Sequence, residues 1–230
     1  MAGFLFSLAS YAIGIGSMAI FFLYIQFSVD RSPAPFSLAA LARDCALFLI
    51  FPLQHSLLAR EMTKHRLARR LHPLLLRPLF VGTSGIAILV ILWLWQPFGP
   101  LLFSVDSWIP DAIFFASVAA IILTTTGLDH FRMFGVKQGI AHWKKQTDAP
   151  PERLSTNGFY GIVRHPLTSL LIAAIWSHST MTAGRLLFNS LFTAYSLLGT
   201  VFEQKDLHRK FGKDYEAYRK KVPGFIPRPW

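Results

Sequence analysis

Charged residues are scarce in this sequence. They account for 15% of its 230 residues, whereas soluble domains contain about 25%. Apolar residues make up 53% of the chain, which is more than a water-soluble core of this length can bury, while a lipid bilayer accepts helices that are apolar on every side. The shortage of charge excludes a separate soluble domain. It predicts an all-α integral membrane protein that occupies residues 1–230 as a single domain.

Cysteine is nearly absent, and so are the common metal-binding motifs. Cys45 is the single cysteine and lies in an apolar stretch, so it forms no internal disulfide and is expected to be a small buried residue. No HExxH or CxxC motif accompanies the histidines. We therefore predict neither a disulfide framework nor a metal site.

Acidic residues are the rarer charged type, with 12 Asp and Glu against 23 Lys and Arg and a net charge of +11. In a soluble protein this excess would indicate a nucleic-acid partner. Here the basic residues flank apolar segments, and membrane orientation and attraction to anionic lipids explain them. We expect the lipid bilayer as a partner and no nucleic acid.

Long apolar segments predict a polytopic protein with five to six transmembrane helices. Four segments have the length of one span each, namely Phe4–Phe27, Phe36–Leu58, Leu79–Trp95 and Ile109–Leu128. A fifth segment, Leu167–Phe202, is too long for one span, and we expect it to fold back near Gly184 as a hairpin of two short helices. The first segment is too long for the apolar part of a signal peptide and lacks preceding basic residues, so we expect it to be retained.

The placement of Lys and Arg predicts the orientation of these spans. Most of them lie in residues 60–77, 132–164 and 205–228, which follow the second span, the fourth span and the hairpin. Arg31 and Arg185 fall on the opposite side. Because Lys and Arg are enriched in cytoplasmic loops, both termini are expected in the cytoplasm.

The C-terminal tail has a different pattern. In residues 203–221 apolar residues recur at helical spacing among charges, and Pro223 ends the pattern. We predict an amphipathic helix on the cytoplasmic face. The single domain would thus contain four spans in residues 1–128 and a loop, the helical hairpin and the tail in residues 129–230.

Two polar clusters lie near the cytoplasmic ends of predicted spans. The second span carries Gln54, His55 and Ser56, and the fourth ends at Asp129 and His130. Polar groups near a bilayer mark either hydrogen bonds between helices or a functional site. His55 fits either interpretation equally well. Asp129 either orients His130 as a general base or caps a helix.

Residues 158–166 form the segment with the most chemical information. Its glycines permit a tight loop, Arg164 offers a planar cationic group for a carboxylate, and Pro166 suits the start of the next helix. Glu203, at the end of the predicted hairpin, is expected to place a negative charge at the same cytoplasmic depth as residues 158–166. Together these residues suit a ligand that has both a carboxylate and a cationic group.

These residues also carry a resemblance. Residues 158–166 and Glu203 precede a tail with Leu207, Phe211, Gly212, Tyr215, Tyr218, Val222 and Pro227, and further matches lie in residues 54–60, 95–97, 129–138 and 181–188. This set resembles the superfamily of isoprenylcysteine carboxyl methyltransferases and phospholipid methyltransferases. Within it, the chain is most similar to the methanethiol S-methyltransferase group, which is related to NnrU-like proteins.

The resemblance implies a membrane enzyme of the bacterial inner membrane with a cytoplasmic active site. Its expected cofactor is S-adenosylmethionine, and its expected acceptor is a small thiol, methanethiol, which reaches the site through the membrane and becomes dimethyl sulfide. The residues expected to bind the cofactor are Arg164, His165, Glu203, Tyr160, Gln138, Gly158 and Pro166. The resemblance assigns Arg164 to the carboxylate and Glu203 to the amino group or ribose. His130 oriented by Asp129, or His55, would be the base.

The chain departs from the superfamily pattern in two places. An aromatic residue and a glycine usually follow the Arg-His-Pro motif, but this chain has Leu167–Leu170 there, and Gln204 replaces a second acidic residue. The departures keep a non-catalytic membrane protein as an alternative. A prenylcysteine or lipid acceptor and an NADPH-dependent membrane reductase are the others, and the sequence leaves the oligomeric state open.

Overall fold

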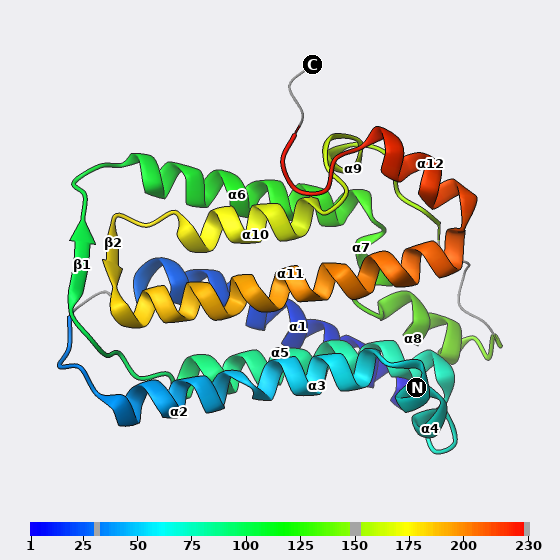
Figure 1. The fold of residues 1–230 in the computed structure, drawn as a ribbon. Helices are drawn as coiled ribbons and strands as arrows, with labels where there is room; N and C mark the ends of the chain where they lie inside the picture. Colours follow the sequence, from blue (N-terminus) through cyan, green and yellow to red (C-terminus); the bar gives the residue numbers. More distant parts are fainter. Residues whose placement is uncertain (30–32, 148–152, 228–230) are drawn as a thin grey trace. The chain divides into compact units, whose positions relative to one another are not determined.

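A computed structural model describes residues 1–29, 33–147 and 153–227 (Figure 1). Within these residues, five helical segments are long and apolar enough to cross a membrane, namely Ala2–Phe27, Leu38–Ala59, Pro73–Leu94, Ile109–Gly127 and Ala183–Phe211. The predicted fold class, an all-α polytopic membrane protein, is confirmed. Arg31, which we expected on the outer side, lies outside the described residues.

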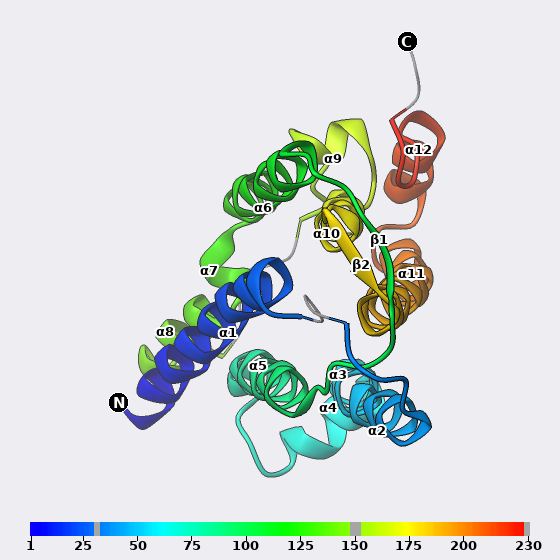
Figure 2. The ribbon, with the colours of Figure 1, turned by 90° about the vertical axis from the view of Figure 1, so that its left-hand side faces the viewer.

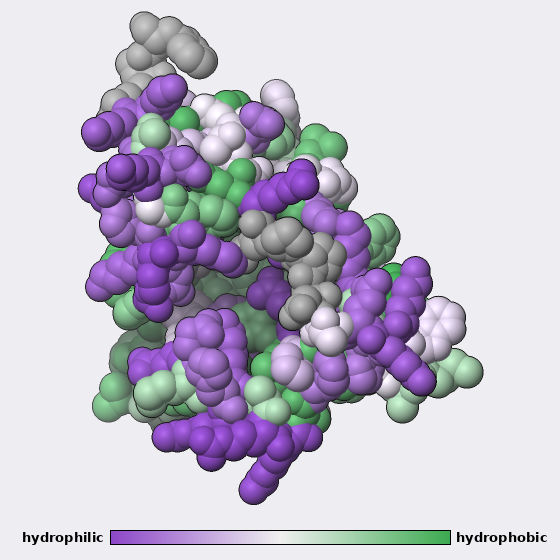
Figure 3. All heavy atoms as spheres, turned by 90° about the vertical axis from the view of Figure 1, so that its right-hand side faces the viewer, coloured by the Kyte–Doolittle hydropathy of each residue, from purple (hydrophilic) through white to green (hydrophobic). Residues whose placement is uncertain are grey.

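The chain forms two compact units that interleave in sequence. Unit 1 consists of Met1–Pro100 and Asp129–Pro151, and unit 2 of Leu101–Leu128 and Glu152–Trp230. That the units form the single predicted domain stays a prediction. Figure 3 shows hydrophilic residues gathered at one end of each unit, around α4 (Glu61–Ala68) and α8 (Val136–Trp143) in unit 1 and around α12 (Lys213–Lys221) in unit 2.

Small residues hold unit 1 together. Helix α1 (Ala2–Phe27) lies beside α5 (Leu76–Leu94) and α8 (Figure 2). It buries the small residues Ser7, Ser10, Gly14 and Ser17 on one face. A Cβ atom added to Gly85 of α5 would lie 2.8 Å from Oγ of Ser17. Small residues on both helices therefore let the backbones approach closely, as is common in membrane proteins.

The second span is broken rather than continuous. We expected one helix over Phe36–Leu58, but α2 (Leu38–Phe48) ends at Leu49 and α3 (Ile50–Ala59) begins there. Pro52 explains the break, because a proline has no N–H group and its ring collides with the carbonyl four residues earlier. Helix α4 and a 3-10 turn, η1 (Pro73–Leu75), then lead into α5.

Unit 2 contains the predicted hairpin, but its two arms are unequal. Helix α10 (Pro166–Trp176) has 11 residues, too few to cross the bilayer, whereas α11 (Ala183–Phe211) has 29. The expectation of two short spans is therefore wrong. Helix α6 (Ile109–Gly127) packs along α10 (Figure 2).

Unit 2 also contains a small antiparallel sheet that the sequence did not predict. Strand β1 (Leu101–Ser104) pairs with β2 (Thr180–Thr182), so that Leu101 faces Thr182 and Ser104 faces Thr180. The sheet lies where the hairpin turns, just before α11 begins. The turn therefore precedes Gly184 and is made of extended chain.

The amphipathic tail is not one helix. Residues 203–211 extend α11, and Gly212 separates them from α12 with a φ of 49°. L-residues with side chains seldom adopt this conformation, which explains a glycine at the bend. The prediction of one helix over residues 203–221 is thus corrected to the end of a long apolar helix and a second short helix.

Candidate functional site

The Arg-His-Pro motif lies between two helices of unit 2. Gly158 has a φ of 59° and precedes α9 (Phe159–Ile162), and Val163 returns the chain to an extended conformation. Pro166 occupies the first position of α10, where its missing N–H group leaves no helical hydrogen bond unmade. Gly158 and Pro166 therefore shape the backbone that presents Arg164 and His165.

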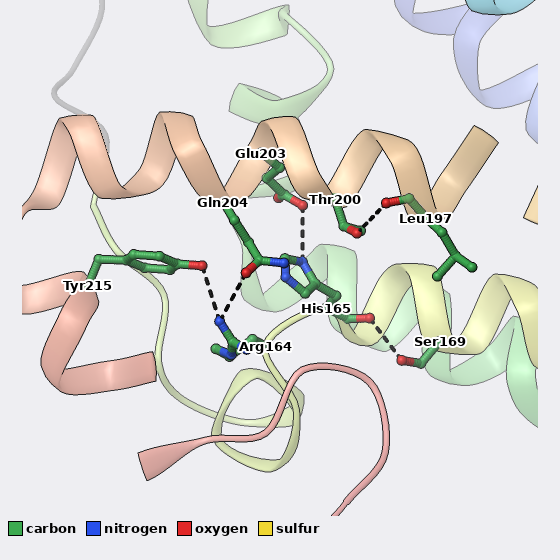
Figure 4. A network of polar contacts seen from close by, with 8 residues as sticks. All are labelled: Arg164, His165, Ser169, Leu197, Thr200, Glu203, Gln204 and Tyr215. Carbon is green, nitrogen blue, oxygen red and sulfur yellow. Dashed lines mark hydrogen bonds and ion pairs between the residues drawn. The ribbon is translucent and has the colours of Figure 1, made fainter. Parts of the chain in front are cut away.

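Among the described residues, the hydrogen bonds of the Arg164 side chain all come from one terminal nitrogen (Figure 4). Its Nη1 atom donates to Oε1 of Gln204 at 3.3 Å and to the hydroxyl of Tyr215 at 3.4 Å. Its Nε atom is buried and has no hydrogen-bond partner among the described residues. A buried donor without an acceptor is costly, so a ligand that accepts a hydrogen bond from Nε would be bound favourably.

His165 and Glu203 form the second pair of the site (Figure 4). Nδ1 of His165 lies 3.1 Å from Oε2 of Glu203, which comes from α11. The imidazole is buried and packs against Phe225 with ring centroids 5.3 Å apart, while the Glu203 side chain is 55% exposed. Glu203 is therefore held at one oxygen and remains open to a ligand.

The chain after α12 fixes the backbone of the motif. The N–H of Arg164 donates to the carbonyl of Pro223 at 2.8 Å, and that of His165 donates to the carbonyl of Gly224 at 3.0 Å. Oγ of Ser169 donates to the carbonyl of Phe225 at 2.9 Å. We call Pro223–Phe225 the C-terminal strap. Sequence reasoning missed it, because its acceptors are backbone carbonyls.

Two tyrosines support the same loop. The hydroxyl of Tyr218, in α12, donates to the carbonyl of Tyr160 at 2.6 Å. Burial raises the pKa of Tyr218 to about 12. Burial, and then the negative charge of Glu203, raise the pKa of Tyr160 well above its ordinary value. Both hydroxyl groups therefore remain protonated donors at neutral pH.

The structure brings six of the seven predicted cofactor-binding residues into unit 2 and places the seventh in unit 1. The six are Arg164, His165, Glu203, Tyr160, Gly158 and Pro166. Gln138, on α8, donates from Nε2 to the carbonyl of Arg132 at 3.1 Å. Its buried Oε1 has no partner among the described residues. Its role toward a cofactor stays a prediction.

Asp129 and His130 are adjacent but do not form the orienting pair that we expected. Asp129 caps α7 (His130–Met133) by accepting from the N–H of Arg132 at 3.4 Å, and its other carboxylate oxygen accepts from Nζ of Lys137 at 2.6 Å. The hydrogen bond from Lys137 is the main reason that the pKa of Asp129 is lowered. The capping interpretation therefore describes Asp129, because both of its carboxylate oxygens have partners other than His130.

His130 and His55 have other partners within unit 1. Nε2 of His130 lies 3.0 Å from the hydroxyl of Tyr11, a contact that sequence reasoning missed. Nδ1 of His55 lies 3.1 Å from Oγ of Ser84, and its ring packs against Phe80 with centroids 4.5 Å apart. His55 thus links α3 to α5. Catalytic roles for the two histidines stay predictions.

The described residues contain no group of three or more His, Cys, Asp or Glu that could hold a metal ion. The apolar helices and the site around Arg164 define the class of this protein as an integral membrane protein in which a buried arginine nitrogen has no partner among the described residues.

Comparison with known proteins narrows this class to a family. The chain is 33% identical over 222 residues to the methanethiol S-methyltransferase of Crocosphaera subtropica, which covers 94% of this chain and 85% of that protein. It is 32% identical over 243 residues to the methanethiol S-methyltransferase of Pseudomonas deceptionensis, which covers 99% and 90%. The chain belongs to the methanethiol S-methyltransferase family, a family of enzymes that require a methyl donor.

The chain is also similar to a protein from an animal. It is 30% identical over 184 residues to Nurim of Rattus norvegicus, which covers 74% of this chain and 69% of that protein. No family model matches the chain, and no solved structure matches it. The family predicted from the sequence is confirmed.

Proposed function

We propose that this protein transfers the methyl group of S-adenosylmethionine to methanethiol and forms dimethyl sulfide. Two relatives that align with most of the chain are named methanethiol S-methyltransferase. The observation within the structure that carries the proposal is the buried Nε of Arg164, which has no partner among the described residues. A methyl donor with an amino-acid end group supplies the carboxylate that this nitrogen lacks.

The residues of unit 2 fit such a donor. Arg164 would hold its carboxylate, and Glu203, fixed by His165 at 3.1 Å, would accept hydrogen bonds from its amino group or ribose. Tyr160 would position the adenosyl part, and Gly158 and Pro166 shape the loop. Gln138 of unit 1 is retained as a further positioning residue because its buried Oε1 lacks a partner among the described residues.

When bound, S-adenosylmethionine supplies a methyl group on a sulfonium ion, and as the thiol sulfur forms a bond to that carbon the sulfonium–carbon bond breaks to leave S-adenosylhomocysteine. The thiolate is the reactive form of the acceptor, so a base is needed to remove the thiol proton. His130 is the first candidate, since Tyr11 fixes its ring through Nε2. His55 is the second. The other residues bind, orient and exclude water.

The charge pattern supports a location for this chemistry. Most Lys and Arg residues lie in the segments that follow apolar helices in the sequence. In each unit these segments lie at the end that is hydrophilic in Figure 3. By the positive-inside rule this end lies in the cytoplasm, together with both termini and Arg164, in a bacterial inner membrane. Methanethiol is small and apolar enough to arrive through the bilayer.

The test is calorimetric binding of S-adenosylmethionine to detergent-purified protein. Saturable binding is expected for the unmodified protein, with a loss of about a hundredfold or more in Arg164→Ala and in Glu203→Ala. Arg209→Ala is the matched control, because Arg209 is an exposed arginine of α11 that forms a surface ion pair with Asp206. It should bind as the unmodified protein does.

A headspace assay for dimethyl sulfide from methanethiol then tests the acceptor. Product formed by the unmodified protein and by Arg209→Ala, and not by Arg164→Ala, supports the proposal. If the folded, unmodified protein fails to bind S-adenosylmethionine, the proposed donor is wrong. If Arg164→Ala binds normally, the donor site lies elsewhere.

A further inference from the structure

The acceptors that hold Arg164 are both electrically neutral. Nη1 donates to the amide oxygen of Gln204 and to the hydroxyl of Tyr215 (Figure 4). The neighbouring carboxylate, Glu203, pairs with His165. Among the described residues Arg164 forms no ion pair. The guanidinium is thus fixed in place by neutral acceptors, and no carboxylate among the described residues forms an ion pair with it.

The unused edge of the guanidinium has the shape that a carboxylate requires. Nη1 makes the hydrogen bonds to Gln204 and Tyr215, and buried Nε makes none among the described residues. Nε and Nη2 point to the same side of the planar group and form a fork for two parallel hydrogen bonds. Gly224 adds no side chain beside Nη2, where an added Cβ would lie at 3.6 Å.

A glutamate at position 204 would change this arrangement without changing its shape. Its carboxylate would occupy the site of the Gln204 amide, accept from Nη1 as a charged partner and compensate the charge of Arg164. Like charges near one site also oppose each other, so it would repel an incoming carboxylate. The neutral amide avoids both effects.

Resting on the proposed function, we infer that Gln204 is a positioning residue that, with Tyr215, aims the charged edge of Arg164 and thereby selects a methyl donor that carries a carboxylate. The replacement of an acidic residue by Gln204 is, on this view, a means of strengthening donor recognition. The inference thus explains why this chain has Gln204 where the superfamily usually has an acidic residue.

The experiment compares two probes, S-adenosylhomocysteine, which has the carboxylate, and 5′-methylthioadenosine, which lacks it. Calorimetry is performed on the unmodified protein and on Gln204→Glu, Gln204→Ala and Tyr215→Phe. Gln204→Glu should bind S-adenosylhomocysteine at least about tenfold more weakly, and its affinity for 5′-methylthioadenosine should be unchanged. Gln204→Ala, which keeps the charge of Arg164 free, should lose less than Gln204→Glu, and so should Tyr215→Phe.

The order of these losses separates charge from packing. Glutamate has the size of glutamine, so a residue that only fills space would tolerate Glu better than Ala. Equal affinity of Gln204→Glu and the unmodified protein for S-adenosylhomocysteine would overturn the inference and leave the proposed function standing. Failure of the unmodified protein to bind either probe would instead contradict the proposed donor site itself. Weaker binding of both probes by Gln204→Glu would indicate a disturbed fold and also overturn the inference.

Discussion

Two arginines, one in each unit, show why an arginine near a helix end does not by itself mark a site. Arg77 of unit 1 donates from Nε to the carbonyl of Met133 at 2.7 Å, and its guanidinium lies over the ring of Phe80 at 5.3 Å. Nε of Arg164 in unit 2 is buried and has no partner among the described residues. The fold of unit 1 thus satisfies Nε of the first arginine, whereas the described residues of unit 2 do not satisfy Nε of the second.

The histidines extend the comparison. In unit 1, Nδ1 of His55 lies 3.1 Å from Ser84, and the ring packs on Phe80, so the side chain joins two helices. In unit 2, His165 contacts Glu203 through Nδ1, and its buried Nε2 has no partner among the described residues. The imidazole of His55 therefore joins two helices, whereas Nε2 of His165 and Nε of Arg164 are buried without a partner among the described residues.

The largest effect is expected from replacing each arginine by lysine. Lysine keeps the charge but lacks the planar fork, so Arg164→Lys should weaken binding of S-adenosylmethionine by about a hundredfold. Arg77→Lys should leave this affinity unchanged and only lower thermal stability. Calorimetry and a thermal melt of each variant make the measurement. Equal losses of affinity in the two variants would remove the distinction between the units.

The next effect concerns the packing of unit 1. A Cβ atom on Gly14 would lie 2.5 Å from Cγ1 of Val81, whereas one on Gly16 of the same helix would meet nothing within 4 Å. Gly14→Leu should therefore destabilise the protein by about 2 kcal/mol, and Gly16→Leu should not. Denaturation in detergent followed by circular dichroism compares them. A destabilisation of similar size in Gly16→Leu would contradict the assigned α1–α5 interface.

A smaller effect is expected at Tyr218 of unit 2. Tyr218→Phe removes the hydrogen bond to the carbonyl of Tyr160 and should cost about 1 kcal/mol. Because burial raises the pKa of Tyr218 from 10.0 to about 12, the stabilisation is fully present below pH 10 and is lost as the pH rises through 12. Tyrosinate absorbance should lose the group that titrates near pH 12 in Tyr218→Phe, whereas Tyr160, whose pKa is also raised, should still titrate late in this variant. An unchanged titration curve would contradict this assignment.

The smallest effect is expected between α3 and α5. Nε2 of Gln54 donates to Oγ1 of Thr83 at 2.8 Å, and hydrogen bonds between membrane helices contribute about 0.6 kcal/mol each on average. Thr83→Val should lower the free energy of unfolding by this amount and leave donor affinity unchanged. A double-mutant cycle with Gln54→Leu isolates the pair. Additive losses would show that the two side chains are not coupled.

The fold was predictable where a property of single segments decides it. Apolar length alone located the first four spans, and the break at Leu49 follows from Pro52 once its missing N–H group is considered. The unequal hairpin was not predictable from apolar length. It depends on extended residues before α11 that pair with β1, which lies far away in the sequence.

The candidate site also has a part that the sequence predicted and a part that it could not predict. Arg164 and Glu203 could be selected as charged groups next to apolar helices, and the structure places both in unit 2. The contacts of Gln204 and Tyr215 with Nη1 span 40 and 51 residues, and no local pattern reports which nitrogen of an arginine is occupied. Tyr11 was likewise hidden, because it reaches His130 across 119 residues.

The C-terminal strap has a consequence for biosynthesis. Oγ of Ser169 donates a hydrogen bond to the carbonyl of Phe225, 56 residues further along the chain. The N–H groups of Arg164 and His165 donate to the carbonyls of Pro223 and Gly224. The ribosome must therefore release the strap before these hydrogen bonds can form. By then the helices from α1 to α10 have already left the ribosome. The helices from α1 to α10 are therefore available for insertion into the bilayer before the hydrogen bonds of the Arg-His-Pro loop can be completed.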